Sequence, residues 1–256
     1  MIDQESIAQF QEQGFLLVPG FEVGAVCDKM REELELAIAE DKVQTPDVFD
    51  AGMVHNCFMR GNYMLRHLES PTLRFATDTL LCQNAIVYAY QSSSLPPGGG
   101  RNYGSRTHVD CPRFIDGYRT NLGYILALQP FTLQNGATFV LPGSHKSKDQ
   151  PTEEYFNANA LRVTCNQGDA IFFDGRLYHR AGVNDTSSWR HSITINFCRP
   201  FMRTRFDYPR MMLQTGLTLT VNSSARKYLG YDVRMPVSLE EFYRPEADRL
   251  YLPNQE

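Results

Sequence analysis

The stretch NLGYILALQPFTLQNGATFVL (residues 121–141) decides the fold, because it holds two short runs of strand-forming residues on either side of a turn. Residues 121–128 and 137–141 are rich in β-branched and aromatic side chains, which suit a pleated, half-buried strand. The QNG sequence at 134–136 has the polar and glycine residues that turns require. This stretch therefore predicts two short strands joined by a turn.

Short strands of the same kind continue on both sides of this stretch. Their sequences are AIVYAYQ at 85–91, LRVTC at 161–165, AIFF at 170–173 and HSITINF at 191–197. Turn sequences separate them, such as PGS at 142–144 and QGD at 167–169. Many short strands with frequent turns favour a sandwich or a barrel-like jelly roll. We therefore predict a mainly β fold with flanking helices and a jelly-roll core at about 84–200.

Mainly helical sequence precedes this core, at about 1–83. Residues 23–41 give the strongest helix pattern, because apolar residues recur four apart and would line one face. These residues are Val26, Met30, Leu34 and Ile38. A second helix is predicted at 71–81, where Ser70 is suited to cap the first turn and Pro71 to open it. We expect the early helices to pack on one outer face of the sheet.

The remaining sequence, about 201–256, mixes a short predicted helix at 223–229 with irregular segments. It is expected to cover the sheet or one mouth of the roll. With 256 residues, the chain is long enough to bury a core without disulfide or metal staples, and we expect residues 1–256 to form a single domain.

The net charge argues against a nucleic-acid-binding protein. The formal net charge is 25 − 29 = −4, which is not the basic balance of a nucleic-acid-binding protein. Arginines gather locally at Arg199, Arg203, Arg205 and Arg210. A solvated face is the favoured interpretation of this group, and the alternative is a rim that attracts an anionic substrate.

Targeting and redox signals favour a cytoplasmic protein without membrane contact. The N-terminal sequence MIDQESIAQF has no apolar core of a signal peptide, and no apolar stretch is long enough to cross a bilayer. The final residues PNQE do not match a peroxisomal signal. None of the six cysteines lies in a CxxC spacing, so reduced thiols are expected and a zinc ribbon is not.

The segment RTHVD at 106–110 contains a His-x-Asp pair. Residues two apart on a strand point to the same face, so His108 and Asp110 would converge on one point. His179, 179 − 108 = 71 residues later, is the best candidate for a third ligand. Two histidines and one carboxylate that leave other positions open describe the iron site of a non-haem iron(II) oxygenase. Because His-x-Asp alone is common by chance, this prediction depends on the rest of the pattern.

Arg190 strengthens the prediction. It lies 190 − 179 = 11 residues after His179, and a turn over 184–188 would bring it back toward the same pocket. A planar guanidinium suits paired hydrogen bonds to a carboxylate, such as the distal carboxylate of 2-oxoglutarate. The alternative is a surface arginine that opens a strand.

Several segments together resemble the phytanoyl-CoA dioxygenase family of iron(II)- and 2-oxoglutarate-dependent oxygenases. They are FQEQGFLLVPGF at 10–21, the His-x-Asp at 108–110, NGATFVLPGSHK at 135–146, GDAIFFDGRLYHRAGVN at 168–184 and WRHSITINF at 189–197. The resemblance extends over about residues 6–200. It implies a double-stranded β-helix fold and Fe(II), 2-oxoglutarate and O2 as cofactor and co-substrates.

Residue by residue, the resemblance implies that His108, Asp110 and His179 hold the iron and that Arg190 anchors the distal carboxylate of 2-oxoglutarate. Related halogenases have a small residue in place of the aspartate. The presence of Asp110 therefore implies oxygenation instead of halogenation.

Two further positions match places where family members set polar side chains against the co-substrate. Gln91 ends a predicted strand, and Thr138 lies in the NGAT segment. The alternatives are an ordinary strand-end amide for Gln91 and a β-forming strand residue for Thr138.

Residues near the expected mouth of the roll are candidates for substrate contact. They are Met53, His55, Phe58 and Arg113. A solvated loop histidine and a surface arginine are the alternatives for His55 and Arg113. Residues 50–63 and 92–104 are the predicted lids, since loops often gate active sites.

The implied activity is oxidation, most simply hydroxylation, of an unactivated C–H bond in a small metabolite or natural-product intermediate, with release of succinate and CO2. Two other classes stay open: a zinc hydrolase or isomerase, and a non-catalytic ligand-binding jelly roll. Metal content tests the first and succinate production the second. The sequence leaves the oligomeric state open, including a homodimer.

Overall fold

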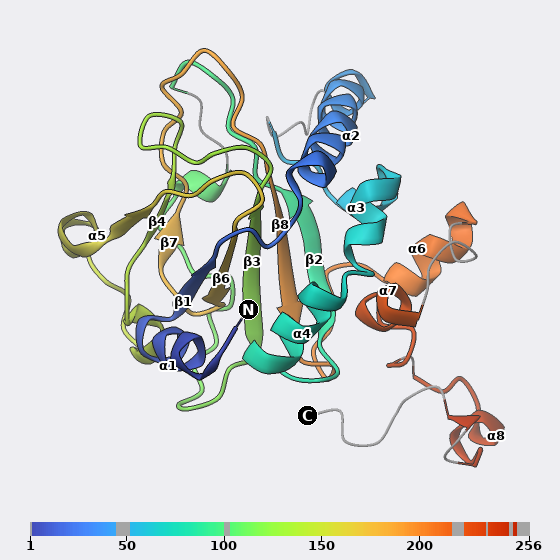
Figure 1. Ribbon diagram of the computed structural model, residues 1–256. Coiled ribbons are helices and arrows are strands. Elements are labelled where there is room, and N and C mark those ends of the chain that lie inside the picture. Colours follow the sequence, from blue (N-terminus) through green and yellow to red (C-terminus); the bar gives the residue numbers. More distant parts are fainter. Residues whose placement is uncertain are drawn as a thin grey trace.

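The computed structural model describes residues 2–44, 52–99, 103–216, 223–233, 235–245 and 248–249. Antiparallel strands in two sheets form its centre (Figure 1). The larger sheet has the order β1-β6-β3-β8-β2, with bounds Phe15–Val18, Ala170–Asp174, Asn121–Ala127, Ser192–Cys198 and Ile86–Ser92. The smaller has the order β5-β4-β7, with bounds Leu161–Val163, Thr138–Val140 and His179–Arg180. The predicted fold class, a jelly roll with flanking helices, is confirmed.

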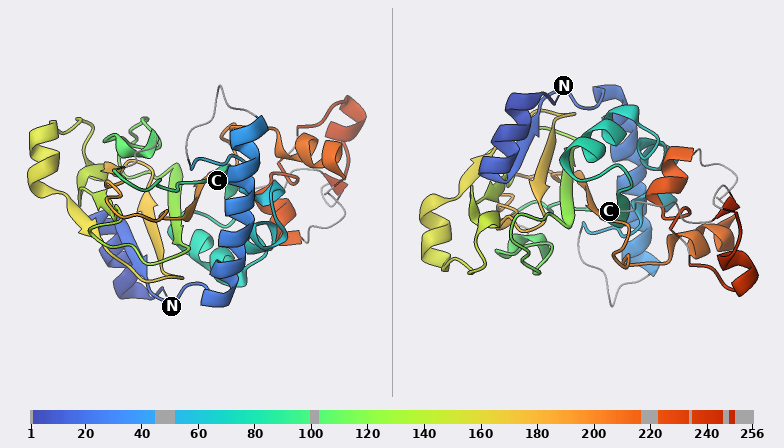
Figure 2. Two further views of the ribbon diagram at one scale, coloured as in Figure 1. Left: turned by 90° about the horizontal axis from the view of Figure 1, so that it is seen from above. Right: turned by 90° about the horizontal axis from the view of Figure 1, so that it is seen from below.

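Helices flank the two sheets. The N-terminal helices are α1 (Gln4–Gln13), α2 (Gly24–Gln44), α3 (Asn62–His67) and α4 (Pro71–Leu80). The others are α5 (Glu153–Asn159), α6 (Tyr208–Thr215), α7 (Ser223–Tyr228) and α8 (Leu239–Phe242). Short 3-10 turns occupy Cys57–Met59, Tyr103–Ser105 and Ser144–Lys146. Helices α2, α3, α4, α6 and α7 gather on one side of the large sheet (Figures 1 and 2).

Alternation along the strands divides the core into two parts. Leu122, Tyr124 and Leu126 of β3 face the helices and share a cluster with Met30 and Leu34 of α2, among other residues. The intervening β3 residues Ile125 and Ala127 face the inside of the roll, in a second cluster that includes Phe131, Val140 and Val163. The early helices therefore pack on one face of the large sheet, as predicted, and the other face is free to line an internal site.

Local structure around the His-x-Asp pair differs from the prediction. His108 forms only an isolated bridge to His179, and Asp110 is not in a strand. Strand β7, which carries His179, is two residues long and was not among the predicted strands. Pro112 follows closely and has no amide hydrogen for a longer ladder, which explains why the segment leaves the sheet.

The C-terminal part packs on the helical side of the large sheet. The helix predicted at 223–229 is present as α7. Tyr208 and Met212 of α6, Tyr228 of α7 and the following Tyr231 are buried in the same cluster as α2. Residues 217–222, 234, 246–247 and 250–256 of the predicted cover lie outside the described residues.

In the part of the chain that the structure describes, no helix combines the length and the apolar character needed to cross a bilayer. The six cysteines form no disulfide, which agrees with the reduced thiols expected from the sequence.

Candidate metal centre

The three predicted ligands converge inside the roll. The backbones of His108 and His179 exchange two hydrogen bonds of 3.0 Å, and their ring centroids lie 4.3 Å apart. Asp110 Oδ1 is 3.5 Å from His108 Nε2 and 3.8 Å from His179 Nε2. One ligand atom from each residue lies within 4.8 Å of the other two. This set fits one metal ion bound on one face, as in non-haem iron sites.

In both histidines, a hydrogen bond from Nδ1 to the backbone carbonyl two residues earlier orients the imidazole. His108 Nδ1 donates to the carbonyl of Arg106 at 2.7 Å, and His179 Nδ1 donates to the carbonyl of Leu177 at 2.9 Å. A hydrogen on Nδ1 leaves the Nε2 lone pair free for a metal. The backbone two residues before each histidine therefore selects the ligating nitrogen.

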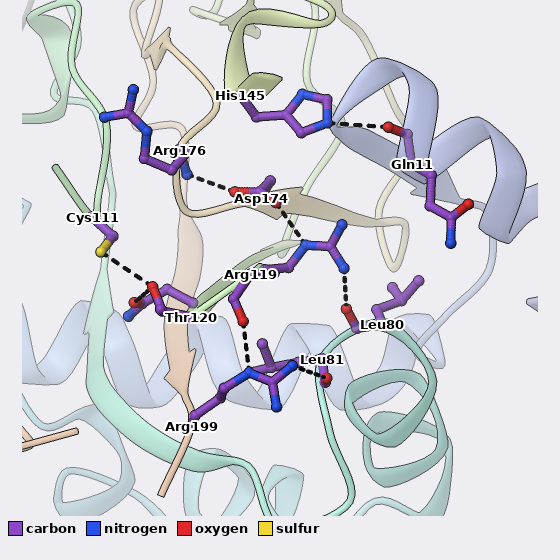
Figure 3. A network of polar contacts seen from close by, with 11 residues as sticks. Gln11, Leu80, Leu81, Cys111, Arg119, Thr120, His145, Asp174, Arg176 and Arg199 are labelled. Carbon is purple, nitrogen blue, oxygen red and sulfur yellow. Dashed lines mark hydrogen bonds and ion pairs between the residues drawn. The ribbon is translucent and has the colours of Figure 1, made fainter. Parts of the chain in front are cut away.

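A buried chain of side-chain hydrogen bonds through two asparagines fixes the orientation of the Asp110 carboxylate. Asp110 Oδ2 accepts from Asn196 Nδ2 at 3.1 Å, and Asn196 Oδ1 accepts from Asn121 Nδ2 at 2.8 Å. Asn121 Oδ1 accepts from Thr120, whose hydroxyl also lies 3.4 Å from Cys111 Sγ (Figure 3). Oδ1 of Asp110 is thereby left to face the two histidines. Neither asparagine is among the predicted site residues, although an amide within the apolar strand sequence SITINF was a usable signal.

The side chain of Arg176 connects chain segments next to the metal ligands through hydrogen bonds. Arg176 Nη1 donates to the carbonyl of Pro112 at 3.0 Å and Nη2 to that of Ser147 at 2.8 Å, while its backbone amide donates to Asp174 Oδ1 at 2.9 Å. Arg119 Nε donates to the other oxygen of Asp174 at 2.7 Å (Figure 3). The chain just after Asp110 and the chain just before His179 are therefore fixed by one guanidinium. The sequence alone did not single out Arg176.

Glycine makes room for a cavity wall beside His179. A Cβ added at Gly123 in β3 would lie 2.1 Å from Cζ of Phe173, so the Phe173 ring would have to move from its place. The Phe173 ring lies 4.6 Å from the His179 ring, centroid to centroid, and lines the site. Gly123 therefore allows Phe173 to pack across β3 and support the second histidine.

The charges of the triad depend on one another. Burial tends to lower the pKa of His108, but the hydrogen bond and charge of Asp110 outweigh it and raise this pKa above the ordinary 6.5. Burial tends to raise the pKa of Asp110, but His108, His179 and Asn196 together lower it. Burial, followed by the charge of His108, lowers the pKa of His179 to about 4. At neutral pH, Asp110 is charged and His179 is neutral, as metal binding requires.

Metal binding should therefore release a proton from His108. Since the pKa of His108 is raised, its proton is present at low pH and is lost only as the pH rises through that value. We expect affinity for Co(II) or Mn(II) to rise about tenfold per pH unit below this pKa and to level off above it. Calorimetry in buffers of different ionisation enthalpy measures the released proton. Affinity that does not change between pH 5.5 and 7.5 would contradict this account.

Asn196→Leu tests the amide chain behind Asp110. It removes one bond to the carboxylate and leaves the buried amide of Asn121 without its acceptor. We expect the Co(II) affinity to fall by roughly 10–100-fold, as for other partners of metal ligands. The free energy of unfolding should fall by about 1–3 kcal/mol. Titration with Co(II) and urea unfolding measure the two effects separately, and an unchanged metal affinity would show that Asn196 does not orient Asp110.

The triad opens into a cavity of about 410 Å³. Five of the other predicted site residues line it: Met53, His55, Gln91, Thr138 and Arg190. From the predicted lids, Met53, His55, Ser93 and Gly104 line the wall, while residues 50–51 and 100–102 lie outside the described residues. The structure thus brings together residues from distant parts of the sequence.

Two predicted substrate contacts do not line this cavity. The side chain of Phe58 is buried on the helical side, where its ring centroid lies 6.1 Å from that of Tyr90 and 5.4 Å from that of Tyr208. The 3-10 turn at Cys57–Met59 directs it there, because burial among aromatic rings removes its apolar surface from water. Arg113 is exposed on the loop after Asp110. Neither side chain is therefore among the residues that line the cavity.

Arg190 is buried at 1% exposure and stacks over Phe131, with 4.3 Å from Cζ to the ring centroid. Its Nη1 lies 3.4 Å from Ser192 Oγ, and its buried Nε has no hydrogen-bond partner in the described part of the chain. Among the described residues, no carboxylate forms an ion pair with it, and burial lowers its pKa to about 10. A buried charge without a partner is costly, so the guanidinium is suited to receive a carboxylate from a ligand.

Gln91 and Thr138 occupy different parts of the wall. Thr138 is buried in β4. Gln91 pairs with His55 in a backbone bridge, and its Oε1 accepts from Arg205 Nη1 at 2.8 Å. Of the four clustered arginines in the sequence, only Arg205 lines the cavity.

A jelly roll with two histidines, one aspartate and a buried arginine in one cavity defines the class of mononuclear non-haem iron oxygenases. The family model described as phytanoyl-CoA dioxygenase (PhyH) matches residues 10–192. The chain therefore belongs to the phytanoyl-CoA dioxygenase family and is an iron- and 2-oxoglutarate-dependent dioxygenase.

Individual relatives agree with this assignment. The uncharacterized protein Rv1501 of Mycobacterium tuberculosis is 29% identical over 238 residues, which cover 91% of this chain and 87% of that protein. Dioxygenase FrzG of Cladobotryum sp. is 30% identical over 121 residues, which cover 44% of this chain and 39% of FrzG.

Solved structures show the same fold. AviO1 from Streptomyces viridochromogenes superposes with a TM-score of 0.64 at 20% identity, covering 79% of this chain and 98% of AviO1. The epimerase SnoN, solved in complex with Fe3+, alpha ketoglutarate and nogalamycin RO, gives a TM-score of 0.60 at 18% identity, covering 76% and 82%.

Proposed function

We propose that this protein inserts one oxygen atom of O2 into an unactivated C–H bond of a small molecule. The other oxygen atom enters 2-oxoglutarate, which becomes succinate and CO2. His108, Asp110 and His179 would hold Fe(II), and Arg190 would hold the distal carboxylate of 2-oxoglutarate. The observation that carries this proposal is the buried guanidinium of Arg190, which lies in the same cavity as the triad and whose Nε has no hydrogen-bond partner among the described residues.

Each residue has a defined task in this proposal. The iron and 2-oxoglutarate supply the oxidising chemistry when bound. The two imidazoles present Nε2 because Nδ1 is held by backbone carbonyls. Asp110 supplies one negative charge, and the apolar side chains of Ile125 and Phe173 keep water from that part of the wall.

Gln91 and Thr138 line the same cavity and are proposed as secondary contacts to the co-substrate. Gln91 keeps its amide hydrogens for this purpose, because its contact with Arg205 uses only Oε1. Met53 and His55 remain proposed substrate contacts.

A small natural-product intermediate is the proposed substrate class. The cavity volume of about 410 Å³ falls in the range of small-molecule sites. SnoN is described as an epimerase from nogalamycin biosynthesis, which supports a similar setting for this chain. We also propose that residues 1–256 work as one catalytic domain and that the protein acts in the cytoplasm.

Coupled turnover tests the proposal. The iron-loaded protein, 2-oxoglutarate and a panel of candidate metabolites are mixed in air, and O2 uptake and succinate are measured together. We expect one succinate for each O2 consumed and an oxygenated product with a true substrate. A zinc hydrolase or isomerase would instead act without O2, and a non-catalytic binding protein would give no succinate.

A further inference from the structure

The catalytic cavity contains a second arginine that the proposed chemistry does not use. Arg205 lines the cavity from the segment before α6. Its backbone amide donates to the carbonyl of Tyr88 at 3.0 Å, which fixes this segment against β2. Its guanidinium carbon lies 5.6 Å from the Tyr88 ring centroid, and Nη1 donates to Gln91 Oε1 at 2.8 Å. The side chain is therefore held in place by uncharged partners.

The described residues that line the cavity supply no counter-ion for Arg205. Asp110 is the only carboxylate among the lining residues, and its oxygens face Asn196 and the two histidines. Among the described residues, no acidic side chain forms an ion pair with Arg205. With Arg190 assigned to 2-oxoglutarate, the cavity keeps one permanent positive charge that has no negative partner among the described residues.

The other clustered arginines do not share this position. Arg199 donates to the carbonyls of Arg119 and Leu81 (Figure 3). It also stacks over Tyr118, with 4.3 Å from Cζ to the ring centroid. Arg203 and Arg210 are exposed and do not line the cavity. Only one member of the group is directed at the site.

We propose that Arg205 forms an anion subsite and that the substrate carries a carboxylate or phosphate group. A guanidinium has five N–H donors in a fixed fork, and Gln91 occupies only one of its nitrogens. Arg205 is exposed whereas Arg190 is buried, so the anionic group binds near solvent and Arg190 stays with the co-substrate. His55 lies beside this subsite through its backbone bridge to Gln91. This inference rests on the proposed function, because that function assigns Arg190 to 2-oxoglutarate.

Three probes of similar size and different charge test the subsite: benzoate, phenyl phosphate and neutral benzamide. Each is titrated without O2 into protein loaded with Fe(II) and 2-oxoglutarate, and binding is followed through the visible spectrum and by calorimetry. We expect at least one anion to bind about tenfold more tightly than benzamide, as for a charge-assisted hydrogen bond. The stronger of the two anions identifies a carboxylate or a phosphate as the preferred group.

Variants assign the preference to a residue. Arg205→Gln should remove the roughly tenfold preference, because it replaces the charge with an amide. Arg205→Lys should keep part of it, since it retains the charge without the fork. Arg203→Gln is the matched control and should leave the preference unchanged.

Failure of this inference is distinct from failure of the proposed function. Equal affinities for anions and benzamide, no anion binding at millimolar concentration, or a preference that survives in Arg205→Gln would overturn the anion subsite. An anion that displaces 2-oxoglutarate binds at Arg190 and would also count against it. If Fe(II) and 2-oxoglutarate fail to bind, the oxygenase proposal fails, and calorimetry on the metal-free protein still measures the preference due to Arg205.

Discussion

Arg190→Leu is expected to weaken 2-oxoglutarate binding by about a hundredfold, as when one partner of a buried charge pair is truncated. The reason is that the guanidinium of Arg190 is buried in the cavity, and no described residue forms a hydrogen bond with its Nε. The Michaelis constant for 2-oxoglutarate and direct titration of the anaerobic iron-loaded protein measure the effect. Arg203→Leu, which changes an exposed arginine, should bind 2-oxoglutarate normally.

The stability of the same variant separates a ligand-binding arginine from a structural one. Burial lowers the pKa of Arg190 to about 10, so the folded protein holds this charge at a cost. Leucine removes that cost, and we expect the unloaded variant to unfold at the same urea concentration as the unloaded wild type or a higher one. Added 2-oxoglutarate should stabilise only the wild type. A large loss of stability with unchanged 2-oxoglutarate affinity would show that Arg190 is structural.

Asp110→Ala is expected to lower iron-dependent succinate formation at least about 1,000-fold, as seen when a residue of an interdependent catalytic group is removed. It takes away the only carboxylate among the described residues that line the cavity. The loss of metal affinity should exceed the roughly 10–100-fold expected for changes to outer partners such as Asn196. The raised pKa of His108 should also fall, because Asp110 causes the rise.

Two comparisons make the Asp110 result interpretable. Asp110→Asn keeps the size and the contact with Asn196 but loses the charge, so it should bind Co(II) weakly as well. Asp116→Ala changes an exposed acid on the following loop and should retain activity. Normal succinate formation by Asp110→Ala would remove Asp110 from the metal site.

Much of the fold was predictable because its signals are local. Short β-branched runs and turn sequences located most strands, and apolar residues four apart located α2. The capping residue Ser70 was also correct, as its hydroxyl accepts from the backbone amide of Leu73. Strand β7 was missed because two residues are too few for any alternating pattern.

The site was predictable only in part, for a related reason. The proposed metal ligands and Arg190 are chemically distinctive at recognisable spacings, so the sequence singles them out as candidates, and the structure brings them into one cavity. Asn196 and Arg176 act through contacts with residues far away in the chain, at Asp110 and Pro112. Arg205 was visible in the sequence only as one of four clustered arginines, and its contact with Gln91 distinguishes it from the other three. Phe58 was predicted to contact substrate because it is close in sequence to Met53 and His55. In the structure its side chain packs in the hydrophobic core instead.

Anaerobic binding of iron(II) and 2-oxoglutarate tests the central claim most directly. The protein is purified without oxygen, and the visible spectrum is recorded before and after adding both components. We predict a weak charge-transfer band that requires both and is absent from His179→Ala and much weakened in Arg190→Leu. Folded, iron-loaded wild-type protein that shows no band with saturating 2-oxoglutarate would contradict the assignment of this cavity as an oxygenase site.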